Sequence, residues 1–167
     1  MSKTTGRQSA ARVFVALTLL PAGPAHACWE TAAARYGVSS ELLYAIARTE
    51  SNLDPAAIGR NRDGSRDIGL MQINSSWLPT LALHGIGEHE LLEPCTSIQV
   101  GAWILAGNVQ RLGYTWDAVG AYHTASPTRR RAYAERVYRQ IAEVSRTAQY
   151  SRHAIASTES PAAAPPH

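Results

Sequence analysis

Glu50 combines an acidic side chain with apolar neighbours at helical spacing. Leu43, Ala47 and Glu50 are spaced i, i+4 and i+7, so a helix places them on one face. Pro55 disfavours helix at the residue before it, so this helix must end soon after Glu50. Burial and the negative end of the helix dipole both favour a protonated carboxyl. The segment therefore predicts a general acid that keeps its proton near neutral pH. The alternative is an ordinary surface glutamate at a helix end.

Two further segments mix polar with apolar residues. Residues 69–74 read GLMQIN, in which Gln72 and Asn74 flank an isoleucine, so at least one of them needs a polar partner. Met71 is as compatible with a core as with a binding site. Residues 121–123 read AYH and end a short helix that Thr115 can cap.

The segments 50–55 (ESNLDP), 69–74 and 121–123, in this order and spacing, resemble the lytic transglycosylase family with the goose-type lysozyme-like fold. The resemblance covers roughly residues 28–144. The two cysteines and residues 61–65 are similar to small, specialised members that accompany type III or type IV secretion, conjugation or pilus machines.

The resemblance implies that Glu50 is the single catalytic acid and base. In the family, this glutamate protonates the glycosidic oxygen between N-acetylmuramic acid and N-acetylglucosamine. As a carboxylate it then takes the proton of the C6 hydroxyl, and a 1,6-anhydro ring closes. The N-acetyl group of the substrate stabilises the positive sugar, so neither a second carboxylate nor a cofactor or metal is expected, unlike in two-carboxylate glycosidases. The implied substrate contacts are Ser51, Met71, Gln72, Asn74, Tyr122 and His123.

His123 departs from the family pattern, which has asparagine after Ala-Tyr. An amide donates and accepts through fixed groups, whereas the protonation of an imidazole depends on pH. Either His123 is a tolerated polar residue, or it makes substrate binding sensitive to pH.

The N-terminus has the order of a secretory signal over residues 1–27. Basic residues precede an apolar run at 13–20, and small residues at 25–27 offer a cleavage site. The run is shorter than the roughly 20 residues that cross a bilayer. No later stretch reads as transmembrane. The expected location is therefore periplasmic or secreted.

The charge of the exported part argues against nucleic acid as a partner. The first 27 residues hold Lys3, Arg7 and Arg12 and no acid; without these three, the 16 basic residues become 13, equal to the 13 acidic ones. A nucleic-acid binder keeps its positive excess in the folded part. Five arginines of the last helix, at positions 129–131, 136 and 139, form either a solvated face or an anion-binding patch.

Cys28 and Cys95 are the two cysteines of the sequence, and an oxidising compartment predicts that they form a disulfide. The alternating polar side chains at 61–67 loosely resemble a calcium loop, but Gly64 is out of place and the closing glutamate is missing. A turn is the better interpretation, with a small hairpin around it.

The elements that must position these groups are mostly helices, so the expected fold is mainly α and lysozyme-like (goose-type), with at most a small hairpin. A steady apolar period from Ile98 to Leu112 predicts a central helix, capped by Thr96 or Ser97 and ended by Gly113. A last helix opens at Pro127. The side chains expected to face inward from it are Ala134, Val137, Tyr138 and Ile141.

The predicted organisation is a signal peptide at 1–27, a lysozyme-like transglycosylase domain at 28–146 and a disordered Ala/Pro/Ser-rich tail at 147–167. The function that fits is cleavage of peptidoglycan glycan strands, next to a secretion, conjugation or pilus apparatus. The alternatives are a lysozyme-type hydrolase of the same bond and a non-catalytic peptidoglycan-binding module.

Overall fold

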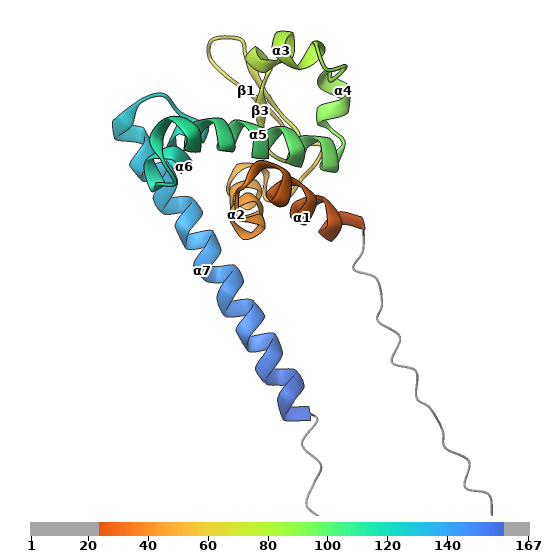
Figure 1. The fold of residues 1–167 in the computed structure, drawn as a ribbon, viewed down its shortest axis with the longest axis vertical. Helices are drawn as coiled ribbons and strands as arrows, with labels where there is room; N and C mark the ends of the chain where they lie inside the picture. The colour runs from red at the N-terminus through yellow and green to blue at the C-terminus, as the bar shows by residue number, and fades with distance from the viewer. Residues whose placement is uncertain (1–23, 159–167) are drawn as a thin grey trace, which may run out of the picture.

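The fold begins with two helices, α1 and α2, which lie next to each other below α5 (Pro94–Leu112) in Figure 1. The structure is a computed structural model and describes residues 24–158. Helix α1 spans Pro24–Tyr36 and ends at Gly37, whose φ of +67° is available to glycine without strain. Helix α2 spans Ser40–Ser51. The Ser39 side chain caps it by accepting the N–H of Leu42 at 3.2 Å.

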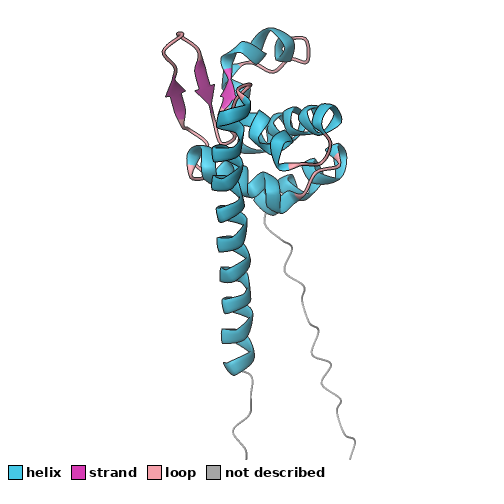
Figure 2. Cartoon of the chain, turned by 90° about the vertical axis from the view of Figure 1, so that its left-hand side faces the viewer, coloured by secondary structure: helices cyan, strands magenta, loops and turns pink. Residues whose placement is uncertain are grey.

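A three-stranded antiparallel sheet follows α2. Strands β1 (Ile58–Arg60) and β2 (Arg66–Ile68) form the hairpin that the sequence predicted, and β3 (Ile73–Asn74) adds a short third strand. The register sets Asp67 opposite Asn74 across β2 and β3. Figure 2 shows the hairpin projecting from the helices, at the opposite end of the molecule from the last turns of α7.

Helix α5 (Pro94–Leu112) is the central helix that the apolar period predicted, and it ends at Gly113 as expected. Its start differs from the prediction. Pro94 begins the helix after Glu93, because proline suits a first turn whose N–H groups have no partner in the helix. Ser97 is therefore no cap: it is buried, and its hydroxyl accepts the N–H of Met71 at 3.1 Å.

Short helical turns connect the sheet to α5. They are a 3₁₀ turn (Ser75–Trp77), α3 (Leu78–Ala82) and α4 (Glu88–Leu91). The disulfide joins Cys28 on α1 to Cys95 on α5, as predicted. It fixes α1 along the first turns of α5.

Helices α6 (Trp116–His123) and α7 (Pro127–Thr158) complete the fold. Thr115 caps α6 by accepting the N–H of Ala118 at 3.3 Å. Helix α7 packs against α2 and α6 with its first half, while its second half extends beyond the other helices (Figures 1 and 2).

The inward face of α7 corrects one prediction. Tyr138 is 57% exposed, whereas Tyr133 is 1% exposed. Tyr133, Val137 and Ile141 repeat every four residues, so a helix aligns them on the side that faces α2, and Tyr138 turns about 100° away. Tyr133 is separated only by Ala132 from the three arginines at 129–131, and this polar run obscures the apolar period.

Two further predictions concern the ends of the chain, namely the signal peptide at 1–27 and the disordered tail at 147–167. Helix α7 continues through residues 147–158, where the sequence predicted the start of a disordered tail. These residues include no proline or glycine, and the first proline beyond them is Pro161, so nothing local stops the helix. Residues 1–23 and 159–167, which hold most of the predicted signal and the end of the tail, lie outside the described part.

The buried core lies between α1, α2, α5 and α7 and includes Leu43, Ile46, Leu105 and Val137. The prediction of a mainly α fold with one disulfide is confirmed. Across residues 24–158, no helix combines the length and the apolar composition that crossing a membrane requires.

Candidate active site

Glu50 lies in the last turn of α2, on the same face as the fully buried Leu43 and Ala47. Its side chain is 12% exposed. Burial raises the pKa of the Glu50 carboxyl to about 7; a hydrogen bond from Tyr133 acts against this rise, and the negative charge of Asp67 adds to it. The carboxyl therefore holds a proton through a large part of the neutral range, as a general acid must.

Tyr133 of α7 fixes the position of this carboxyl. Its phenol donates a hydrogen bond of 2.6 Å to Oε1 of Glu50. The imidazole of His123 stacks on the Tyr133 ring, with centroids 4.8 Å apart and an angle of 2° between the planes. The guanidinium of Arg136 lies over the same ring, 5.3 Å from its centroid. Tyr133 is thus held by neighbours from two helices while it holds Glu50.

His123 brings a second titratable group near the acid. Its Nδ1 lies 3.9 Å from Oε1 of Glu50. Burial lowers the pKa of the His123 imidazole, and the positive charge of Arg136 acts in the same direction. Both effects favour the neutral imidazole beside Glu50.

The hairpin supplies a second carboxylate. Both oxygens of Asp67 accept hydrogen bonds from side-chain amides, Oδ1 from Asn74 at 2.8 Å and Oδ2 from Asn61 at 3.0 Å. Asp67 lines the same cleft as Glu50. The sequence placed Asp67 only in a turn, and the cross-strand pairing with Asn74 makes it part of the site.

The segment 69–74 is folded tightly beneath the cleft. At Gly69 φ is +72°, and a Cβ atom there would lie 2.2 Å from the carbonyl oxygen of Leu91, so the position requires glycine. The Ser51 hydroxyl donates to the carbonyl of Leu70 at 2.7 Å, and the Tyr122 hydroxyl donates to the carbonyl of Met71 at 2.9 Å. Motif residues from three segments therefore bind one another.

Gln72 has the left-handed φ of +49°, which is uncommon for a residue other than glycine. Its side-chain amide donates to the carbonyls of Ala57 and Gly69, at 3.1 and 2.9 Å. Such strain persists only where the surroundings enforce it, and it gathers at functional sites. In this backbone conformation, Gln72 lines the wall of the cleft.

The cleft has a volume of about 510 Å³ and combines side chains from α2, the hairpin, the segment 72–77, α5, α6 and α7. The predicted site residues that line it are Glu50, Gln72, Asn74, Tyr122 and His123. The other lining residues, which were not among the expected substrate contacts, are Asn61, Arg62, Asp63, Asp67, Ile73, Trp77, Ile104, Thr124 and Arg129.

Ser51 and Met71 lie elsewhere than expected. The Met71 side chain is fully buried in the core, and Ser51 binds the backbone, so neither lines the cleft. Ser51 instead binds the 69–74 segment through the carbonyl of Leu70, and the side chain of Met71 anchors that segment in the core. Tyr133 is the residue that sequence reasoning missed, and its i, i+4 relation to Val137 was the available signal.

The arginines of α7 have separate surroundings. Arg130 binds Asp117 at 2.9 Å and the carbonyls of Thr124 and Ala125, so it joins α7 to α6. Arg136 packs on Tyr133, and Arg129 lines the cleft. They do not form one anion-binding patch. Among residues 24–158, no group of three or more His, Cys, Asp or Glu side chains gathers in a geometry suited to a metal ion.

The sequence of the chain is similar to those of known proteins. The model of the family described as "Transglycosylase SLT domain" matches residues 27–145. The chain is 47% identical over 137 residues to "Invasion protein IagB" of Salmonella typhi, which covers 77% of this chain and 86% of that protein. It is 36% identical over 137 residues to "Protein IpgF" of Shigella flexneri, with coverage of 79% and 90%.

A solved structure resembles the chain in shape. An inactive mutant of the lytic transglycosylase Slt from Pseudomonas aeruginosa matches with a TM-score of 0.60 and 22% sequence identity. The match covers 74% of this chain but only 24% of that longer one. It bears on the fold alone, and it confirms the predicted lysozyme-like fold.

Proposed function

Because this chain belongs to the Transglycosylase SLT domain family, we propose that Glu50 is the acid, and then the base, with which it opens peptidoglycan strands. Family membership makes the chain a peptidoglycan lytic transglycosylase. The observation that carries the role of Glu50 is its buried carboxyl at the wall of a cleft, with a pKa near 7 and a hydrogen bond from Tyr133.

In the proposed reaction, protonated Glu50 gives its proton to the glycosidic oxygen between N-acetylmuramic acid and N-acetylglucosamine as the bond from that oxygen to C1 breaks. The carboxylate left behind is a base, and it takes the proton of the C6 hydroxyl. The C6 oxygen bonds to C1 and leaves a 1,6-anhydro end, and Glu50 regains its proton. The pKa near 7 supports both roles, because neither protonation state is strongly disfavoured.

The test is digestion of purified peptidoglycan by the wild-type protein and by Glu50→Gln, with product masses as the readout. We expect anhydro ends from the wild type and none from Glu50→Gln, because the amide cannot give up and regain a proton. If Glu50→Gln cleaved as fast as the wild type, Glu50 would not be the catalytic acid, and the domain would instead be a non-catalytic peptidoglycan-binding module.

A hydrolase of the same bond is the second candidate, and Asp67 is the observation that favours it. Glycosidases that add water use two carboxyl groups, and Asp67 supplies a second one to the cleft. In that case the product masses show reducing ends, and Asp67→Asn abolishes cleavage. In the transglycosylase mechanism, Asp67→Asn retains anhydro products.

We also propose that the chain is exported and opens the wall locally for a secretion, conjugation or pilus machine. The support is the signal-like N-terminus and the similarity to a protein named as an invasion protein. Wild-type protein, but not Glu50→Gln, should restore invasion to a Salmonella strain that lacks IagB. If both proteins restored invasion, cleavage of the wall would not be required for this role.

A further inference from the structure

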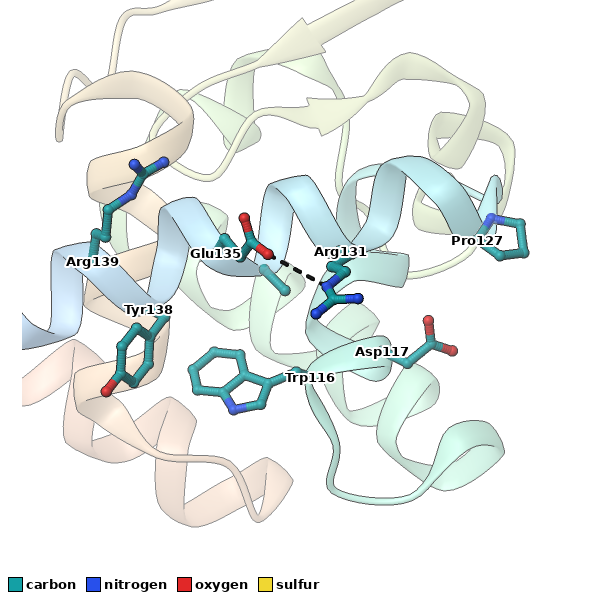
Figure 3. A pocket seen from close by; sticks show the side chains of 8 residues that line it. Trp116, Asp117, Pro127, Arg131, Glu135, Tyr138 and Arg139 are labelled. Carbon is teal, nitrogen blue, oxygen red and sulfur yellow. Dashed lines mark ion pairs between the residues drawn. The ribbon is translucent and has the colours of Figure 1, made fainter.

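A second hollow lies on the surface formed by α6 and the first half of α7. Its volume is about 640 Å³, and it shares no lining residue with the cleft around Glu50. Figure 3 shows Trp116 from α6 and Tyr138 from α7 with their rings side by side, and charged side chains around them. We call this hollow the Trp116 groove. Its lining residues are Trp116, Asp117, Pro127, Arg131, Ala134, Glu135, Tyr138 and Arg139.

The aromatic pair presents ring surface to solvent. Trp116 is 47% exposed and Tyr138 is 57% exposed. Their centroids are 5.5 Å apart with an angle of 88° between the planes, an edge-to-face arrangement that favours contact between the two rings. The two rings therefore form an aromatic platform that is present without a ligand.

The two helices that carry the platform cannot move apart easily. Gly120 of α6 approaches α7 so closely that a Cβ atom there would lie 2.5 Å from the carbonyl oxygen of Arg130. Arg130 also binds Asp117, at 2.9 Å. A rigid site loses little conformational entropy when it binds a ligand.

Charged side chains of both signs surround the platform, and most of them are paired. Arg131 forms an exposed ion pair with Glu135 at 3.4 Å, Asp117 is bound by Arg130 at 2.9 Å, and Arg139 adds one positive charge. A phosphate or another polyanion calls for a strongly positive site, and a purely apolar partner would leave these charged groups without a role. Sugars suit both features. Their C–H faces stack on aromatic rings, and their neighbouring hydroxyls bind planar guanidinium and carboxylate groups.

We propose that the Trp116 groove is a non-catalytic binding site for glycan strands of N-acetylated amino sugars. The inference builds on the proposed function, since such strands are the substrate of the cleft. With one strand segment in the groove and another in the cleft, the enzyme stays on an insoluble wall between cleavage events. The competing occupant of the groove is a protein partner. The experiments below test whether the glycan binds there.

The tryptophans allow the two sites to be observed separately. Trp77 lines the cleft, Trp116 lines the groove, and Trp29 packs against Tyr44 outside both. We would titrate the full-length ¹⁵N-labelled Glu50→Gln protein with a β-1,4-linked tetramer of N-acetylglucosamine and follow the indole N–H signals by NMR. Trp77 and Trp116 are both expected to shift, with different concentration dependences, while Trp29 stays unchanged.

The outcomes of the titration are distinct. No shift at Trp116 overturns the inference, whatever Trp77 does. No shift at Trp77 counts against the proposed function of the cleft. The inference is also overturned if the indole signal of Trp116 shifts with a soluble peptide of the peptidoglycan cross-links but not with the sugar.

A comparison of soluble and insoluble substrate gives a second test. Tyr138→Ala and the double variant Trp116→Ala/Tyr138→Ala should retain their rate on soluble glycan fragments. We expect the double variant to bind sedimented peptidoglycan about tenfold more weakly, since stacking on two rings is lost. Leu83→Ala removes another exposed apolar side chain and is the matched control. Equal binding by all these proteins, with unchanged melting temperatures, would contradict the proposal.

Discussion

At the scale of single residues, Glu50 links the stability of the protein to pH. Its pKa is about 7 in the folded chain against an ordinary value of 4.5, so the folded state holds its proton over a range in which the unfolded state loses it. Glu50 therefore contributes stability that is fully present below about pH 4.5 and is lost as pH rises to about 7. The loss is about 3 kcal/mol, from a pKa difference of about 2.5.

Glu50→Gln should remove this dependence, because an amide accepts the Tyr133 hydrogen bond without ionising. We expect the free energy of unfolding of the variant, relative to that of the wild type, to be about 3 kcal/mol higher at pH 8 than at pH 4. Urea unfolding at both pH values measures this difference. Glu135→Gln, which changes an exposed glutamate, is the control. Parallel pH curves for Glu50→Gln and the wild type would show that the carboxyl ionises as in water.

Tyr133→Phe tests the hydrogen bond directly. The phenol favours the carboxylate, so its removal raises the pKa of Glu50 further and should move the alkaline limb of activity upward by about one pH unit. The rate at the optimum should fall about tenfold, because the carboxyl loses its fixed orientation. Tyr138→Phe makes the same chemical change on an exposed residue and should leave the pH profile in place.

His123→Asn addresses the departure from the family pattern. Burial and the charge of Arg136 lower the pKa of His123, so its protonation affects only the acidic side of the profile. An imidazolium 3.9 Å from Glu50 favours the carboxylate and weakens the acid. We therefore expect His123→Asn to flatten the acidic limb and to keep the alkaline limb. An unchanged pH–activity profile would mean that His123 is only a tolerated polar residue.

At the scale of secondary-structure elements, the contact between α6 and α7 brings His123 to Tyr133. It depends on Gly120, where a Cβ atom would meet the Cβ and carbonyl oxygen of Arg130, both at 2.5 Å. Gly120→Ala must push the helices apart, since a backbone atom cannot yield as a flexible side chain does.

We expect Gly120→Ala to destabilise the protein by about 2 kcal/mol or more and to reduce activity, since Tyr122 and His123 move with α6. Gly107→Ala on α5 is the control, because nothing lies within 4 Å of a Cβ atom there. Its effect should be neutral, or stabilising by up to about 1 kcal/mol, since alanine favours helix. Thermal denaturation of the two variants separates close packing from helix propensity.

At the scale of the whole molecule, the Cys28–Cys95 disulfide closes a loop of 67 residues around α2 and the sheet. The bond restricts the unfolded chain, so Cys28→Ser/Cys95→Ser should lower the free energy of unfolding by about 4 kcal/mol. Chemical denaturation measures the loss. Reductant should lower the stability of the wild type by a similar amount and leave the double variant unaffected. An equal response of both proteins to reductant would indicate that the disulfide does not stabilise the fold.

The sequence by itself determined the features that depend on local period and local chemistry. The apolar stripes of α2 and α5, the Thr115 cap of α6, the end of α5 at Gly113 and the turn of the hairpin all follow from residues within one or two turns of one another. The placement of Glu50 at the end of an apolar stripe belongs to this class, because a helix fixes which side chains share a face.

Only the tertiary structure decided which groups surround Glu50. Tyr133 is 83 residues away along the chain and reaches the carboxyl because α7 packs against α2. Asp67 enters the cleft through its strand pairing, and Met71 leaves it because the 69–74 segment turns its side chain into the core. Such contacts depend on the packing of distant elements, which no local pattern of residues encodes, and they fix the pKa of the acid.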